Sequence, residues 1–123
     1  MDIIFSISGK VIKNKGRGKK LGFPTANLEA PTDIPDGIFA GYTTIDGKRH
    51  KSMLFVGKAE TFGDEERFAE SHILDFHDDL YGIEIKLEAV KKIREARKFY
   101  DPEEMLNQMR MDEKITRVLL DDK

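Results

Sequence analysis

The sequence predicts a small β-barrel that ends in one α-helix. Several short segments rich in β-branched and aromatic residues are separated by turn signals. Segment 80–93 alternates apolar with charged residues, as a half-buried antiparallel strand does. After Phe99 the apolar period changes to that of a helix. Because short hairpin-connected strands commonly close on themselves, we expect one all-β barrel domain over residues 1–123.

The first strand is predicted between residues 3 and 12, where apolar residues alternate and Gly9 allows a bend. A loop rich in glycine and lysine follows. Segment 28–36 contains two prolines and no periodicity, so it is also predicted to be a loop. This loop is either a flap over a bound nucleotide or a plain connection.

A hairpin is predicted in the middle of the chain. Its strands are residues 37–45 and roughly 48–56, because the intervening Asp46-Gly47 is a strong signal for a two-residue turn. A polar, acidic loop at 57–67 follows the hairpin.

Two further strands are predicted after this loop, at 68–76 and from residue 80 to about 93. Residues 77–79 form the turn between them. The alternation in the last strand breaks near Ala89-Val90, which indicates a β-bulge.

The C-terminal helix is predicted to begin after Asp101, a favourable N-cap residue. Pro102 suits the first helical position, and Glu104 completes a pattern like a capping box. The apolar residues of the helix fall on one broad face, which should pack on the sheet and cover one end of the barrel. They are Met105, Leu106, Met109, Ile115, Leu119 and Leu120.

Composition argues against several classes of protein. The chain has no cysteine, so it offers neither disulfides nor thiolate metal ligands. Its net charge of −2 argues against a general nucleic-acid-binding domain, since such domains are usually basic. No apolar run approaches membrane-spanning length, and the N-terminus does not read as a secretory signal, so we expect a cytoplasmic protein. The oligomeric state stays open, and a monomer is compatible with the sequence.

The stretch from Gly16 to Asn27 reads GRGKKLGFPTAN and combines glycines, cations and oxygen-bearing side chains. Backbone N–H groups in a glycine-rich turn can bind phosphate, and the lysines add positive charge. Thr25 and Asn27 alternate, so both side chains point to one side of an extended segment. Their oxygens suit Mg²⁺ when phosphate supplies other ligands. The alternative is an ordinary turn threonine and asparagine.

This stretch resembles the signature of the riboflavin kinase family. Four further motifs follow in the family's order: DGIFAG at 36–41, ESHILDF at 70–76, DLYG at 79–82, and Ile93-Arg94 followed by Lys98-Phe99. The resemblance extends from about Gly9 to Leu120 and implies a six-stranded antiparallel Greek-key barrel with a C-terminal helix. In bacteria such a domain usually follows an adenylyltransferase domain, so the chain is either a stand-alone kinase or an excised domain.

The resemblance implies transfer of the γ-phosphate of ATP to the ribityl 5′-hydroxyl of riboflavin, which yields FMN. The implied partners are riboflavin, FMN, ATP and ADP, with Mg²⁺ or another divalent cation beside the nucleotide. Glu70 matches the family's catalytic base. On a strand it shares a face with Phe68 and Leu74, whose apolar surroundings favour a general base, although a glutamate paired with a cation or with His72 is the alternative.

The resemblance also assigns binding roles. The implied nucleotide-binding residues are Gly16, Gly18, Lys19, Lys20 and Thr25, and the choice between the two lysines stays open. The implied metal ligands are Thr25 and Asn27, and Arg94 is expected near the flavin ring.

Three positions depart from the family's pattern and affect ligand contacts more than the fold. Asn14 stands where many members have glycine, Glu60 replaces a proline, and Ala96 replaces a glutamate. These departures leave room for an altered substrate preference or weak activity. Two other functions also stay open: a non-catalytic barrel whose lysine-rich loop and second basic run bind RNA or another polyanion, and a flavin-binding regulator that has lost the transfer reaction.

Overall fold

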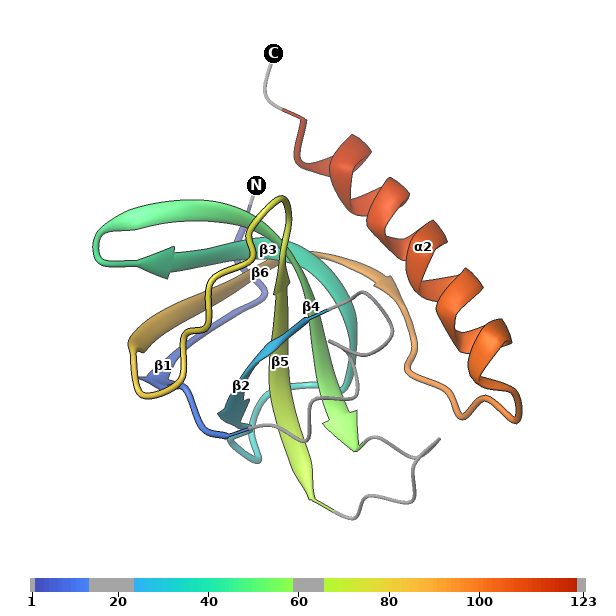
Figure 1. Ribbon diagram of the computed structural model, residues 1–123, viewed down its shortest axis with the longest axis horizontal. Coiled ribbons are helices and arrows are strands. Elements are labelled where there is room, and N and C mark those ends of the chain that lie inside the picture. The colour runs from blue at the N-terminus through green and yellow to red at the C-terminus, as the bar shows by residue number, and fades with distance from the viewer. Residues whose placement is uncertain (1, 14–23, 59–65, 122–123) are drawn as a thin grey trace.

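The described part of the chain forms a nearly closed barrel of six antiparallel strands with one helix packed against its outside (Figure 1). The computed structural model describes residues 2–13, 24–58 and 66–121. The predicted fold class, all-β with a C-terminal helix, is therefore confirmed. The elements are β1 (Phe5–Lys10), β2 (Ala26–Glu29), β3 (Gly37–Ile45), β4 (Lys48–Lys58), β5 (Arg67–Ile73), β6 (Glu84–Arg94) and α2 (Pro102–Leu119).

The strands follow the order β1-β6-β3-β4-β5-β2, and each neighbouring pair is antiparallel. Strands distant in sequence are neighbours, β1 with β6 and β2 with β5, as in a Greek key. The cylinder closes where Ile12, just after β1, bridges Asn27 of β2 and donates its N–H to the Asn27 carbonyl at 2.9 Å. Asn27 therefore lies at the seam of the barrel.

The central hairpin has the predicted turn. Asp46 and Gly47 adopt φ angles of 53° and 79°, the left-handed conformation that a tight turn between twisted strands requires. Pairing then runs without interruption from Ile45↔Lys48 to Gly37↔Val56. The Asp46-Gly47 prediction is confirmed.

The last strand contains the predicted bulge. Ala40 of β3 pairs with Lys91 while Gly41 pairs with Ala89, so Val90 has no partner in this ladder. Leu87 and Ala89 point into the barrel, whereas Val90 packs outside it against Leu120 at the end of α2. Ala89 and Ile93 are four residues apart, so regular alternation would put both on one face, but Ile93 packs on the helix side. The extra residue at Val90 accounts for this change of face.

The barrel interior is an apolar core to which every strand contributes. Phe5 and Phe39 pack edge to face at its centre, with ring centroids 5.2 Å apart. The core also includes Leu28, Leu54, Val56, Ala69, Ile73, Ile85 and Leu87.

The helix begins where predicted. The Asp101 side chain accepts a hydrogen bond from the N–H of Glu103 at 3.0 Å, and Pro102 is the first helical residue. The helix lies along the outer face of β3, β4 and β6, not over an end of the barrel (Figure 1). Neither α2 nor any other part of the described chain has the length and apolar character of a transmembrane helix.

The predicted apolar face of the helix is partly wrong. Leu106, Met109 and Leu119 pack against the sheet, but Ile115 is exposed. Buried Asp112 and Thr116 occupy the stripe instead. Both can be buried because both form hydrogen bonds, Asp112 with Arg94 and Thr116 with the Asp112 carbonyl.

Several strand boundaries also differ from prediction, and β6 begins at Glu84 where a strand was expected from residue 80. Residues 28 and 29, assigned to a loop, belong to β2, a short strand held by pairing with the distant β5. β5 ends at Ile73, because Asp75 adopts a φ of 58° and turns the chain. The predicted strand 68–76 is therefore too long at its C-terminal end.

Candidate functional site

Three oxygen-bearing side chains predicted as site residues, Thr25, Asn27 and Glu70, lie together on the outside of the barrel. The Thr25 hydroxyl lies 3.1 Å from Asn27 Oδ1 and 3.2 Å from Glu70 Oε1. The hydroxyl has one hydrogen for these two acceptors, so it can donate fully to only one of them. The structure thus brings the predicted metal ligands and the predicted base into one cluster.

Strand pairing places these residues. Asn27 of β2 lies directly opposite Glu70 of β5, and Phe55 of β4 lies opposite Glu70 on its other side. Residues opposite each other on paired strands project to the same face of the sheet. Glu70 is half-buried between an amide and an aromatic ring. Asn27 is buried, with 8% of its surface exposed.

The chemistry of this cluster fits a hard divalent cation that also binds phosphate. The oxygens come from a hydroxyl, an amide and a carboxylate, all of which suit Mg²⁺. Within the ranges that the structure describes, no three histidine or acidic side chains gather closely enough to hold a metal by themselves. A cation at Thr25 and Asn27 would therefore take its remaining ligands from phosphate and water.

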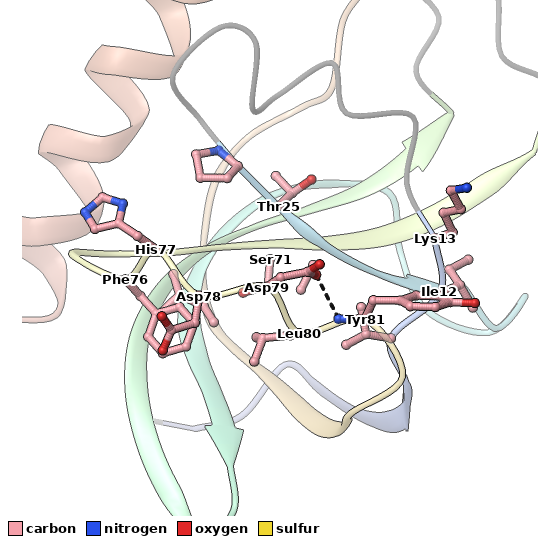
Figure 2. A pocket seen from close by; sticks show the side chains of 14 residues that line it. Ile12, Lys13, Thr25, Ser71, Phe76, His77, Asp78, Asp79, Leu80 and Tyr81 are labelled. Atoms are coloured by element: carbon pink, nitrogen blue, oxygen red, sulfur yellow. Dashed lines mark hydrogen bonds between the residues drawn. The ribbon is translucent and has the colours of Figure 1, made fainter.

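A cavity of about 510 Å³ opens beside Thr25 at one end of the barrel. Figure 2 shows Thr25 on one side of it and the segment 76–81 on the other. Its wall is apolar at Ile12, Phe76 and Leu80, positively charged at Lys13, and negatively charged at Asp78 and Asp79. The cavity thus joins an apolar surface to a polar edge, which suits a ligand with a flat ring and a charged tail.

The DLYG motif shapes this cavity. Asp79 Oδ1 accepts a hydrogen bond from the N–H of Tyr81 at 3.0 Å (Figure 2). Gly82 has a φ of 81° and donates its N–H to the Val11 carbonyl at 2.9 Å. The turn is therefore fixed to the segment after β1. Sequence reasoning quoted this motif but assigned it no site residue.

Four of the predicted nucleotide-binding residues belong to the glycine-rich loop. Gly16, Gly18, Lys19 and Lys20 lie outside the described residues. The described residues that flank this gap, Lys13 and Pro24, both line the cavity.

Arg94 lies at the end of β6, bound to the helix. Its guanidinium donates to Asp112 from Nε at 2.9 Å and from Nη2 at 2.7 Å, and from Nη1 to the Glu95 carbonyl at 3.0 Å. The Asp112 side chain is 1% exposed and also accepts from Gln108 at 3.0 Å. Sequence reasoning missed Asp112, although a carboxylate within an apolar helix stripe was a usable signal.

A second ion pair joins the end of β5 to α2. Arg117 donates to both carboxylate oxygens of Asp75, at 3.0 and 3.1 Å. Hydrogen bonding from Arg117 lowers the pKa of Asp75, and the same bond raises the pKa of Arg117. Both side chains are exposed, so this pair contributes only modestly to stability.

Comparison with known proteins agrees with this geometry. The family model described as riboflavin kinase matches residues 2–120. The RNA-binding riboflavin kinase RibR of Bacillus subtilis is 36% identical over 108 residues, which cover 86% of this chain and 47% of that protein. The chain spans less than half the length of the curated relatives it matches, between 17% and 47%.

Solved structures that share the fold include two of different origin. One, described as a macrolide-efflux protein from Streptococcus pneumoniae, has a TM-score of 0.78 and 34% identity, over 91% of this chain and 38% of that chain. The other is riboflavin kinase from Trypanosoma brucei, with a TM-score of 0.66 and 21% identity over 94% of this chain and 78% of that chain. With the family model matching nearly its whole length, the chain belongs to the riboflavin kinase family.

Proposed function

We propose that this chain is a riboflavin kinase that transfers the γ-phosphate of ATP to the ribityl 5′-hydroxyl of riboflavin. The observation that supports it most is the cluster of Thr25, Asn27 and Glu70, held within hydrogen-bond distance beside a cavity large enough for a ligand. Phosphoryl transfer depends chiefly on positioning and on charge stabilisation, which such a cluster can supply.

In this proposal Glu70 accepts the proton of the attacking 5′-hydroxyl. Its carboxylate is half-buried and lies 3.2 Å from the Thr25 hydroxyl, so it would act next to the phosphate-binding side of the site. Thr25 and Asn27 would hold a divalent cation, Mg²⁺ being the expected one. When bound, the cation would neutralise charge on the phosphate oxygens.

The nucleotide would occupy the cavity beside Thr25. Its base would meet the apolar wall at Phe76 and Leu80, and its phosphates would extend toward Thr25. Gly16, Gly18, Lys19 and Lys20 would then bind the phosphates, as the resemblance implies.

Arg94 is proposed to contact the flavin with a guanidinium group whose position is fixed by its bonds to Asp112 and Glu95. Asp112 and Glu95 use three of its five N–H groups, and two remain without a partner among the described residues. Arg94 would therefore reach a ligand only from a guanidinium that the helix holds in place.

The test is direct. Purified protein incubated with riboflavin, ATP and Mg²⁺ should form FMN, separated from riboflavin by chromatography and detected by its fluorescence. No FMN from the wild-type chain would refute the proposal.

The second candidate is a non-catalytic module that binds a polyanion, which the name of the RNA-binding relative favours. The chain's net charge of −2 is against it, so we expect no general affinity for nucleic acid. Salt-sensitive binding of a labelled RNA without FMN formation would favour this second candidate.

A further inference from the structure

His72 connects three separate parts of the molecule. It belongs to β5, two residues beyond Glu70 and on the same face of that strand. Its Nδ1 lies 3.0 Å from the Pro24 carbonyl oxygen, and its Nε2 lies 3.0 Å from Glu113 Oε1 of α2. The side chain is buried, with 8% of its surface exposed.

The Pro24 bond bears directly on Thr25. The Pro24 carbonyl belongs to the planar peptide unit that leads into Thr25, so a hydrogen bond to it fixes the orientation of that unit. Pro24 precedes β2, which begins only at Ala26, so strand pairing does not hold this peptide. The hydrogen bond from His72 holds this peptide, which the β2 strand pairing does not reach.

Both partners of the ring are hydrogen-bond acceptors. A carbonyl has no hydrogen to give, so Nδ1 must carry hydrogen for the bond to Pro24 to form. The bond to Glu113 likewise needs a hydrogen, on Nε2 or on the carboxyl group. On the other side of the ring, the Glu113 carboxylate also lies 3.7 Å from Arg117 Nε. Glu113 of α2 contacts the ring, Arg117 of α2 contacts Glu113, and Asp75 beyond β5 is close enough to interact electrostatically with His72.

We propose that His72 is a positioning residue that sets Thr25 against Glu70 and makes the divalent-cation site depend on the seating of α2. The inference rests on the proposed function, because it concerns the cation and the nucleotide of that same site. Glu113 holds the ring from the helix, and the ring holds the peptide before Thr25. A shift of α2 would therefore loosen the ligand side of the site without touching the ligand.

Two substitutions separate the two bonds. In His72→Asn the amide nitrogen sits at the same number of bonds from the backbone as Nδ1, so it can still donate to Pro24. In His72→Gln the longer side chain reaches toward Glu113 and leaves the Pro24 carbonyl without its donor. A residue that serves only to anchor the helix would show the opposite order of effects.

The measurement is ADP binding by titration calorimetry, with and without Mg²⁺. We expect His72→Gln to reduce the gain in affinity that Mg²⁺ gives by about tenfold, the value of about one hydrogen bond. The affinity for ADP alone should stay within about twofold. His72→Asn should keep most of the Mg²⁺ gain.

Leu106→Ala tests the dependence on α2. Leu106 packs α2 against Ile38 and Met53 and has no part in the His72 bonds, so its truncation loosens the helix and leaves the Pro24 bond in place. It should reduce the Mg²⁺ gain in part, and by less than His72→Gln does. An unchanged Mg²⁺ gain in either variant would overturn the proposal.

A measurement on the wild-type protein avoids any failure of a variant to fold. Long-range ¹H–¹⁵N correlation of the histidine rings should show hydrogen on Nδ1 of His72, and a ring protonated on Nε2 alone would contradict the inference. If the wild type forms FMN but His72 fails these tests, only the positioning role falls. If it binds Mg²⁺ and ADP as expected but forms no FMN, the proposed function falls instead.

Discussion

Thr25 has one hydroxyl hydrogen and two acceptors within reach, Asn27 Oδ1 and Glu70 Oε1. In this arrangement the three side chains hold one another in place through a single hydroxyl. A cation bound to the Thr25 and Asn27 oxygens would compete with these bonds and leave the Glu70 carboxylate available as a base. The Thr25 and Asn27 oxygens would thus form hydrogen bonds when no cation is bound and coordinate the cation when it is present.

Removing the carboxylate charge tests the base. We expect Glu70→Gln to lower the rate of FMN formation on the order of 10²–10⁴-fold, the usual value of a general base. The amide keeps the size of the side chain and an oxygen for Thr25, so the unfolding temperature should change little. Glu84→Gln, an exposed glutamate of β6, is the control and should keep the wild-type rate. Full activity in Glu70→Gln would remove the base assignment but leave the enzyme reading intact.

Removing the hydroxyl tests the cation ligand. Thr25→Val keeps the shape of the side chain, whereas Thr25→Ser keeps the oxygen. We expect the valine variant to need on the order of tenfold more Mg²⁺ for half-maximal FMN formation, and the serine variant to stay near wild type. Kinase assays over a range of Mg²⁺ concentrations measure this. The same Mg²⁺ requirement in both variants would argue against Thr25 as a ligand.

At the scale of elements, α2 is joined to the barrel by apolar packing and by polar contacts. Leu106 and Met109 cover Ile38 and Met53 on the outer face of the sheet. The Arg94–Asp112 pair crosses the same interface, with Asp112 almost fully buried. A buried carboxylate is costly unless it is paired, so this contact fixes the helix in one position along β6.

Breaking this pair should cost much more than breaking an exposed one. We expect Asp112→Asn to lower the free energy of unfolding by about 2–4 kcal/mol, because the Arg94 guanidinium would lose its buried charge partner. Glu104→Gln, which removes the exposed pair between Glu104 of α2 and Arg97 in the segment after β6, should cost less than about 0.5 kcal/mol. Urea denaturation measures both. Equal losses would show that burial does not set the strength of the pair.

At the scale of the whole molecule, the barrel could be predicted from sequence because its signals are local. The Asp46-Gly47 turn and the alternation of Ile85 and Leu87 need no knowledge of distant partners. β2 could not be found in this way, since four residues show too little periodicity and their strand partner lies far along the chain. Asp112 was missed because a search for apolar stripes does not anticipate a buried ion pair.

The candidate site was predictable in part. Thr25 and Asn27 were expected to share a side from their alternation alone, and the structure places their oxygens 3.1 Å apart. The nearness of Glu70 could not follow from periodicity, because it depends on which strand pairs with β2. The family resemblance supplied that residue, whereas His72 was considered only as a neighbour of Glu70.

Acid should weaken the whole fold through Asp75. Because Arg117 lowers the pKa of Asp75 in the folded state, the pair contributes stability above the ordinary carboxyl pKa. That contribution is lost as the pH falls through the lowered pKa, below about pH 4. Asp75→Asn should therefore flatten the acid limb of unfolding temperature against pH.

The partner variant checks the cause. Arg117→Gln should give the same flattening, and the double variant should add nothing further, because both changes remove one interaction. Additive effects would show that the two residues act on acid stability separately.

The extra residue in β6 lets one strand pack against both the barrel core and the helix, with Ala89 inside the barrel and Ile93 on the helix side. Deleting a single residue there would reverse the faces of the strand residues that follow, so that apolar side chains would point to solvent and charged side chains inward. Removing α2 would likewise expose the apolar outer face of the barrel that the helix covers, and this face would favour aggregation. A shortened version of this protein would therefore need polar residues on that outer face.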